Sequence, residues 1–225
     1  MLELGAARVV FTSRADGDMG HAGEWVAVDD VRPNVAARRR AVLDRPWSWV
    51  RQVHGADVVR VDRPGGGAGE TGDALVSDSD GAVLAILTAD CAPVALVGDN
   101  GAFGAVHAGW HGLVAGVLAE AVDALRDTGA SDIRAALGPC IHPECYEFGT
   151  DDLDRVADLL GPTVRGTTRD GRPALDVPAA VKAALDRAGV KLVHDEDVCT
   201  ACSPDHYSHR ARQEKERQAM VVWRE

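Results

Sequence analysis

The chain has 225 residues, 46% of them hydrophobic and 26% charged, the composition of a globular protein that can bury a large core. Its formal net charge of −11 argues against non-specific binding to nucleic acid and against an anionic membrane as a partner. No stretch reaches the roughly 20 apolar residues of a membrane span, and the first residues lack a secretory signal. With five cysteines and no export signal, we expect reduced thiols, a cytoplasmic location and one domain over residues 1–225, acting as a monomer.

The apolar pattern predicts strands and helices in a mixed order, which favours α+β layers over a doubly wound sheet. A loop is expected over 15–23, and the glycine-rich run 64–72 predicts a second, flexible loop with local disorder. The expected strands cover 9–14, 47–53, 57–61, 81–88, 93–98, 103–108, 133–138 and 218–223. The expected helices cover 31–43, 113–126, 151–161 and 177–189.

Three soft metal ligands lie where a predicted strand gives way to a turn. His54 follows the strand at 47–53, Cys91 follows the apolar run at 81–88, and His107 is near the end of the run FGAVHA. Two imidazoles and one thiolate suit zinc, and three protein ligands leave the fourth tetrahedral position for water or substrate. A lone buried His or Cys is more often a packing residue than a ligand, so the residues alone leave both interpretations open.

Six runs along the chain resemble the YfiH/YlmD-like family, often labelled the multicopper polyphenol oxidase "laccase domain". They are QVHGADV, GDALVSD, TADCAPV, AVHAGWHG, GPCIHPECYEFG and CTACSPDHYSHR, in order, within a match from Phe11 to Trp223. The resemblance implies a four-layer α/β/β/α sandwich with mixed β-sheets. It implies a single catalytic zinc held by His54, Cys91 and His107. It also implies purine nucleosides and phosphate as partners, through phosphorolysis of adenosine, inosine, guanosine and methylthioadenosine and deamination of adenosine.

The chain departs from the family pattern around this metal triad. Where the family has an arginine after HAGW, a histidine follows here, and the paired glycines near the N-terminus are lost. The changed positions are His111, Asp16, Arg38 at the Asn position of the first helix, and Ala211 in place of the second arginine of SYRR. The surroundings that recognise anion and nucleoside are therefore expected to differ, while the metal ligands are intact.

Other polar residues have two interpretations each. Arg210 is our candidate phosphate ligand, with Arg14, Arg39 and Arg217 as weaker candidates, but surface arginines also form ordinary ion pairs. Asp90 either orients a ligand imidazole and so serves catalysis, or caps its turn. Asp73 in GDALV has the same two interpretations, and His111 is either an exposed residue at a helix start or a substrate contact.

Rival functions use the same residues. A copper phenol oxidase needs many histidines in His-x-His pairs, whereas this chain has eight histidines and no such pair; copper can still substitute for zinc at the triad. Cys91 without metal can be the nucleophile of an amidase with His54 or His107 as base, which fits the peptidoglycan editing attributed to some family members. A degenerate binding protein is a further alternative. The other cysteines, Cys140, Cys145, Cys199 and Cys202, can form a structural tetrathiolate zinc site.

Overall fold

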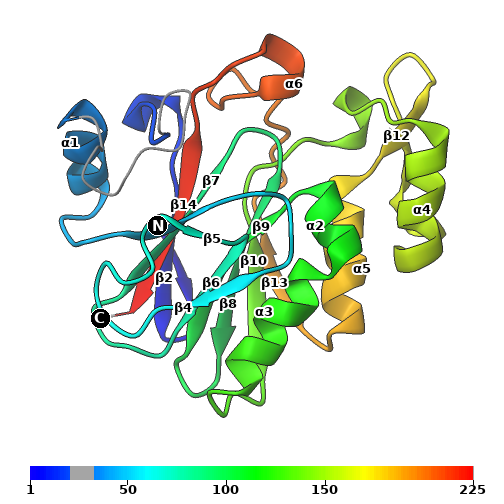
Figure 1. Ribbon diagram of the computed structural model, residues 1–225. Helices are drawn as coiled ribbons and strands as arrows, with labels where there is room; N and C mark the ends of the chain where they lie inside the picture. Colours follow the sequence, from blue (N-terminus) through cyan, green and yellow to red (C-terminus); the bar gives the residue numbers. More distant parts are fainter. Residues whose placement is uncertain (21–32, 225) are drawn as a thin grey trace.

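Two mixed six-stranded sheets form the centre of the molecule in the computed structural model, which describes residues 1–20 and 33–224 (Figure 1). The first sheet has the order β1 (Leu2–Leu4), β2 (Ala7–Phe11), β14 (Gln218–Arg224), β7 (Val83–Thr88), β3 (Ser48–Arg51) and β5 (Glu70–Thr71). The second has the order β13 (Lys191–Asp195), β10 (Ile133–Leu137), β8 (Ala92–Gly98), β9 (Phe103–Ala108), β6 (Ala74–Ser77) and β4 (Val58–Arg60). Each sheet combines parallel and antiparallel pairs.

Helices cover the outer faces of both sheets (Figure 1). The described helices are α1 (Pro33–Val42), α2 (Trp110–Ala115), α3 (Val117–Arg126), α4 (Thr150–Leu160), α5 (Val177–Arg187) and α6 (His209–Arg212). Short 3-10 turns form η1 (Arg14–Asp16), η3 (Pro143–Cys145) and η4 (Pro162–Val164), and a small hairpin pairs β11 (Arg165–Thr167) with β12 (Pro173–Leu175). Helices α2, α3 and α5 lie on the second sheet. Helix α1 lies by the first sheet, on the side that faces away from the second sheet. No described helix combines the length and the apolar character needed to cross a bilayer.

Three separate apolar clusters fill the spaces between these layers. Phe103 and Leu84 are among the residues buried between the two sheets. Leu118 of α3 and Val181 of α5 are buried against the second sheet. Trp49 lies in a third cluster on the outer face of the first sheet, where α1 covers it. Each fully buried side chain of this size contributes about 1.5–3 kcal/mol. The predicted α+β class and the four-layer sandwich with mixed sheets are confirmed.

The structure differs from the sequence prediction in three places. The helix expected over 113–126 is two helices, because Gly116 between them has a left-handed backbone (φ 89°). The glycine-rich run 64–72 is not disordered: it forms hydrogen-bonded turns, ends in β5, and is tied to β3 by the bond from Gly69 N to Trp49 O (2.8 Å). The elements that were not predicted are the strands β1, β5, β6, β11, β12 and β13 and the short helix α6. The predicted loop at 15–23 and the start of the predicted helix at 31–43 lie partly outside the described residues.

Candidate metal centre

Strand register brings the three predicted ligands together. In the antiparallel pair of β8 and β9, Pro93 lies opposite His107, so Cys91, just before β8, is beside the end of β9. His54 follows β3, which runs parallel to β7, so the chain leaves both strands at the same edge of the first sheet. The side chain of Gln52 bonds the backbone N and O of Leu87 (2.9 and 2.7 Å) and fixes that edge. Ligands from both sheets therefore meet at one place.

Asp73 holds two of the ligands in position. Its buried carboxylate accepts backbone N–H bonds from Val53, His54 and Gly55 (3.2, 2.9 and 2.7 Å) and lies 2.8 Å from Nδ1 of His107. Burial alone would raise the pKa of Asp73, but the bonds from His107 and from the backbone of Gly55 and Val53 lower it below its usual value. An ionised carboxylate behind an imidazole fixes the ring and directs Nε2 toward a metal.

Cys91 and His107 shift each other's pKa in opposite directions. Burial alone would raise the pKa of Cys91, but the charge of His107 and the hydrogen bonds of both imidazoles outweigh it and bring the pKa to about 6. Burial alone would lower the pKa of His107, but Cys91 and Asp73 outweigh it and raise that pKa to about 9. The lowered pKa of Cys91 favours the thiolate form, which is the form that binds a metal.

The donor atoms have the spacing and the chemistry for one metal ion. The ligand atoms of His54, Cys91 and His107 all lie within 4.8 Å of one another, and Cys91 Sγ is 3.8 Å from His54 Nε2. Around a tetrahedral zinc with bonds of about 2.0–2.3 Å, such atoms are about 3.3–3.8 Å apart. His54 is exposed and Cys91 is half-buried, so the centre opens to solvent on one side.

The backbone near the centre also carries constraints. His54 and Asp90, which precedes Cys91, both have positive φ (61° and 97°), an uncommon conformation for residues other than glycine. Gly109, between β9 and α2, lies so close that a Cβ there would be 2.7 Å from His54 Cδ2 and 3.3 Å from Cys91 Sγ. The turn into α2 therefore requires glycine.

Asp90 and Arg210 lie beside the centre, where the side chain of Asp90 contacts the backbone of Arg210. The Asp90 carboxylate accepts bonds from Thr200 Oγ1 and from the backbone N of Arg210, both at 2.7 Å, and among the described residues it bonds no imidazole. Asp73, not Asp90, orients His107. The guanidinium of Arg210 lies over the Tyr146 ring (4.5 Å) and donates to Glu147 O (3.0 Å).

The weaker arginine candidates have structural partners. Arg14 pairs with Glu214, Arg39 is buried over Trp47 and Trp49, and Arg217 donates to the carbonyls of residues 214 and 216. At the other altered positions, Asp16 caps η1, Arg38 donates to the carbonyl of residue 18, and Ala211 N donates to Ser208 Oγ. These contacts fasten local turns, and none of them is with a residue of the triad.

A row of aromatic rings runs from the triad to Arg210, and the sequence analysis did not identify it. His111 lies 6.4 Å from the His54 ring and stacks on Trp110 (3.6 Å, 30°), in line with its predicted place at a helix start. Trp110 contacts Phe148, which contacts Tyr146, each pair at 5.3 Å. Nothing local in the sequence signals this row, because Phe148 and Trp110 meet only in the folded chain.

The structure separates the remaining four cysteines. Cys145, Cys199 and Cys202 lie together with Glu144, whereas Cys140 is buried in the core and is not part of that group. The predicted set of four thiols is therefore not brought together.

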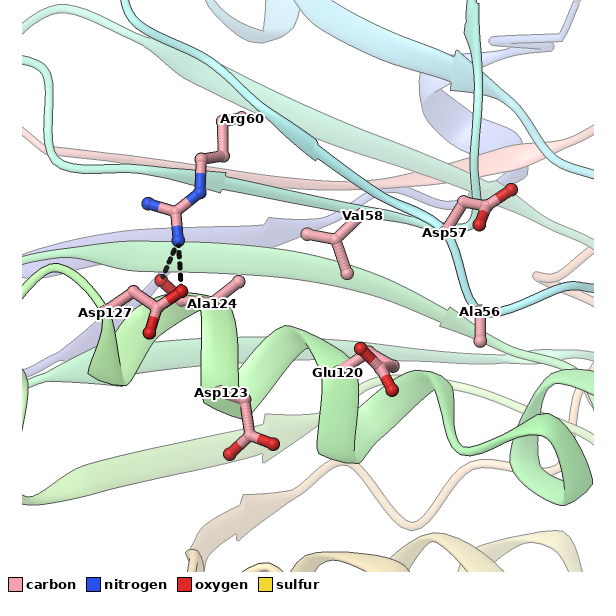
Figure 2. A pocket seen from close by; sticks show the side chains of 8 residues that line it. All are labelled: Ala56, Asp57, Val58, Arg60, Glu120, Asp123, Ala124 and Asp127. Atoms are coloured by element: carbon pink, nitrogen blue, oxygen red, sulfur yellow. Dashed lines mark hydrogen bonds and ion pairs between the residues drawn. The ribbon is translucent and has the colours of Figure 1, made fainter.

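A surface hollow of about 540 Å³ lies between β4 and α3, apart from these groups (Figure 2). It is lined by four carboxylates and one arginine, Arg60, which bonds Asp127 and the carbonyl of Ala124. Its negative lining disfavours phosphate, and it contains neither histidine nor cysteine.

Comparison with known proteins gives consistent matches over the whole chain. Residues 10–225 match the family described as multi-copper polyphenol oxidoreductase laccase. A purine nucleoside phosphorylase of Streptomyces coelicolor is 44% identical over 179 residues, covering 78% of this chain and 74% of that protein. One of Streptomyces griseus is 38% identical and covers 97% and 95%. The crystal structure of YlmD from Geobacillus stearothermophilus superposes with a TM-score of 0.83 at 29% identity, covering 97% of this chain and 92% of that one.

Proposed function

Because the chain belongs to the multi-copper polyphenol oxidoreductase laccase family and has relatives named purine nucleoside phosphorylase, we propose that it is a zinc-dependent purine nucleoside phosphorylase. The observation that carries the proposal is the convergence of His54, Cys91 and His107 on one point, with the Asp73 carboxylate behind them. Two imidazoles and one thiolate suit zinc and leave one coordination position open. A zinc ion there supplies Lewis acidity next to the bound substrate.

The aromatic row next to the triad is the proposed platform for the purine. A purine stacks on an aromatic face, and His111 on Trp110 presents such a face beside His54. His111 is exposed and therefore accessible to a ligand. Contact with the base is the role that we propose for the position where the family pattern has arginine.

Arg210 is the proposed phosphate ligand at the other end of the row. Its backbone is held by Asp90, which is adjacent to Cys91, and its exposed guanidinium is steadied by the ring of Tyr146. Arginine holds phosphate through paired N–H donors. Asp90 then acts as a positioning residue: its carboxylate fixes the segment that carries Arg210.

The test is chromatographic detection of free purine base from adenosine, inosine or methylthioadenosine, with and without phosphate. We expect base only when phosphate is present, and loss of this activity in Cys91→Ala and His54→Ala. The matched control is His194→Ala, because His194 is a half-buried histidine on β13, outside the triad, that pairs with Glu196. Inosine formed from adenosine without phosphate would add the deaminase activity. Metal-loaded protein that converts no nucleoside would refute the proposal.

A cysteine hydrolase is the second candidate, because Cys91, His107 and Asp73 also form the thiol, base and carboxylate series of such enzymes. The lowered pKa of Cys91 favours it in the metal-free protein. Alkylation by iodoacetamide separates the two candidates. A metal-bound Cys91 is protected until a chelator is added, whereas a free nucleophile reacts at once. The phenol oxidase remains the weaker alternative, because the sequence has no His-x-His pair for a multinuclear copper cluster.

A further inference from the structure

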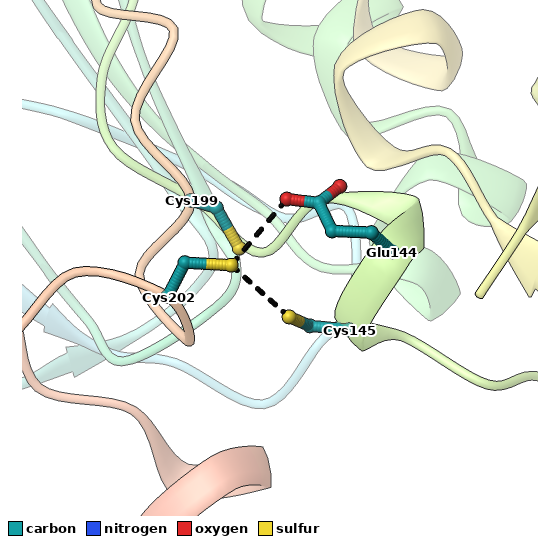
Figure 3. A group of neighbouring side chains, drawn as sticks. All are labelled: Glu144, Cys145, Cys199 and Cys202. Atoms are coloured by element: carbon teal, nitrogen blue, oxygen red, sulfur yellow. Dashed lines mark hydrogen bonds between the residues drawn. The ribbon is translucent and has the colours of Figure 1, made fainter. Parts of the chain in front are cut away.

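We propose that Glu144, Cys145, Cys199 and Cys202 form a second metal site, for a thiophilic divalent cation of the Zn²⁺ type. Three sulfurs and a carboxylate oxygen from two distant segments face a common point, with all four atoms within 4.8 Å of one another (Figure 3). Glu144 and Cys145 belong to η3, and the other two cysteines belong to the turn after β13. Thiolates and carboxylates are established zinc ligands, and four of them close a tetrahedral site.

The spacing of the sulfurs fits a metal after a small adjustment. Zinc–sulfur bonds of about 2.3 Å place two sulfurs about 3.8 Å apart. The sulfurs of Cys145 and Cys202 are 3.2 Å apart, and Cys202 Sγ is 3.5 Å from Glu144 Oε1. Cys202 is exposed, so a rotation of its side chain can open the pair without moving the core.

The neighbours of the sulfurs match those of metal-bound thiolates. The backbone N of His142 donates to Cys199 Sγ (3.4 Å), and Arg169 Nη2 donates to Cys202 Sγ (2.9 Å). N–H donors to sulfur stabilise the thiolate form that a metal needs. Three thiolates and a carboxylate also leave a divalent ion with excess negative charge, which the guanidinium of Arg169 offsets.

The site would be structural and would not depend on the proposed phosphorylase activity. It joins η3, which leads into Tyr146, to the chain segment that leads to Arg210, so it fixes both ends of the contact between that ring and that guanidinium. A disulfide between Cys145 and Cys202 is the competing interpretation. It would make no use of Cys199 and Glu144, which converge on the same point.

The test is metal stoichiometry of the full chain, purified with Zn²⁺ and dialysed. We expect two zinc ions per chain in the wild type, one in Cys91→Ala and one in the double variant Cys145→Ser/Cys202→Ser. Cys140→Ala, which changes a cysteine outside both groups, should keep two. Co²⁺ added to Cys91→Ala protein should produce thiolate-to-metal absorption in the near ultraviolet. This absorption should be absent from the triple variant Cys91→Ala/Cys145→Ser/Cys202→Ser.

Two outcomes would overturn the proposal. One is a single zinc in the wild type and none in Cys91→Ala. The other is a count of three free thiols in unfolded, non-reduced protein instead of five, because it would identify a disulfide. The zinc count of the wild type needs no substitution, so two ions against one decides the question even if a variant fails to fold. If the protein proved to have no phosphorylase activity, the zinc count and the thiol count would still test the second site.

Discussion

At the scale of single residues, Asp73 determines whether the triad exists as a unit. One buried carboxylate caps the turn that carries His54 and bonds the ring of His107, so it couples ligands that come from different sheets. From the sequence, Asp73 was expected either to cap a turn or to orient a ligand imidazole. In the structure it does both. Its charge is retained because four N–H groups point at it.

We predict that Asp73→Asn weakens zinc binding at the triad by about 10–100-fold, because an amide cannot hold the His107 ring as an ionised carboxylate does. The measurement is competition with a chelator, using Cys91→Ala protein as the blank for metal bound elsewhere. Asp99→Asn removes another carboxylate that caps a turn, through Ser131, and is the control. Equal affinities of Asp73→Asn and the wild type would contradict the role assigned to Asp73.

We predict that Gly109→Ala abolishes metal binding at the triad, because the added methyl group would overlap His54 and contact Cys91. Gly149→Ala is a close control. Gly149 also directly precedes a helix, and its own backbone is extended as at Gly109 (φ −64° and −74°). Nothing lies within 4 Å of a Cβ added at Gly149. The same chelator competition applies. If Gly109→Ala bound zinc as the wild type does, the centre would be looser than described.

The candidate metal ligands could be predicted because each lies at or just beyond the end of a recognisable strand, and strand ends at one edge of a sheet converge. The partners of those ligands could not. Which carboxylate reaches His107 depends on β6 lying beside β9 with Ala74 opposite Val106, and β6 itself was not predicted. The contact between Trp110 and Phe148 is long-range in the same way, and only the stacking of Trp110 on its neighbour His111 is local.

At the scale of elements, the break between α2 and α3 sets the direction of the helix that follows the triad. Apolar spacing alone indicated one continuous helix, because periodicity does not register a single left-handed residue. Gly116 supplies that residue and allows α3 to lie along the second sheet (Figure 1), while His111 of α2 stays beside His54. The strands of the core were predicted well for the opposite reason: their apolar runs are bounded by Gly, Pro and Asp. Short or edge strands such as β1 and β13 carry a weaker pattern.

We predict that Gly116→Ala destabilises the fold by about 1–2 kcal/mol, the cost of a left-handed conformation with a Cβ. The space around Gly116 is open, so the cost is conformational and not steric. Gly116→Asn should lose less, because asparagine tolerates this conformation better. The urea midpoints of the three proteins measure the difference. An alanine variant as stable as the wild type would mean that α2 and α3 can join into one helix.

At the scale of the whole molecule, Glu214 connects the two ends of the described chain. Its carboxylate pairs with Arg14 and Arg212 and accepts the backbone N of Ser208 (2.8 Å). Burial alone would raise the pKa of Glu214, but these partners lower it to about 2. A carboxylate with a lowered folded-state pKa stabilises the fold above its unfolded pKa of about 4.5, and this contribution is lost as the pH falls toward 2.

We therefore predict that Glu214→Gln unfolds more easily than the wild type at pH 7, and that the difference shrinks between pH 4.5 and 2. The free energy of unfolding in urea, measured at intervals of pH, tests this. Glu120→Gln on the exposed side of α3 controls for the loss of one negative charge. A difference that stays constant with pH would show that the interaction does not depend on ionisation of Glu214.

Family membership and the layered architecture were both predictable from sequence, because motifs such as TADC and HAGW are spread across the chain and fix its topology as a set. The four members of the group that we propose as a second metal site could not be predicted from the sequence. The spacing of the four cysteines left a tetrathiolate open as an alternative, but Cys140 lies in the core, and the group that we propose includes Glu144 instead. Spacing along a sequence does not report which side of a turn a side chain occupies.

The position of β14 has a consequence for biosynthesis. This strand lies between β2 and β7, with Met220 opposite both Phe11 and Ile86, so the first sheet is joined through the last of its strands to be synthesised. While a ribosome is still adding these residues, the β1–β2 hairpin and the β7–β3 pair have unpaired apolar edges. Exposed edges of this kind recruit other strands. Until β14 has been made and has paired with both strands, the nascent chain therefore carries two strand edges at which it can pair with other chains.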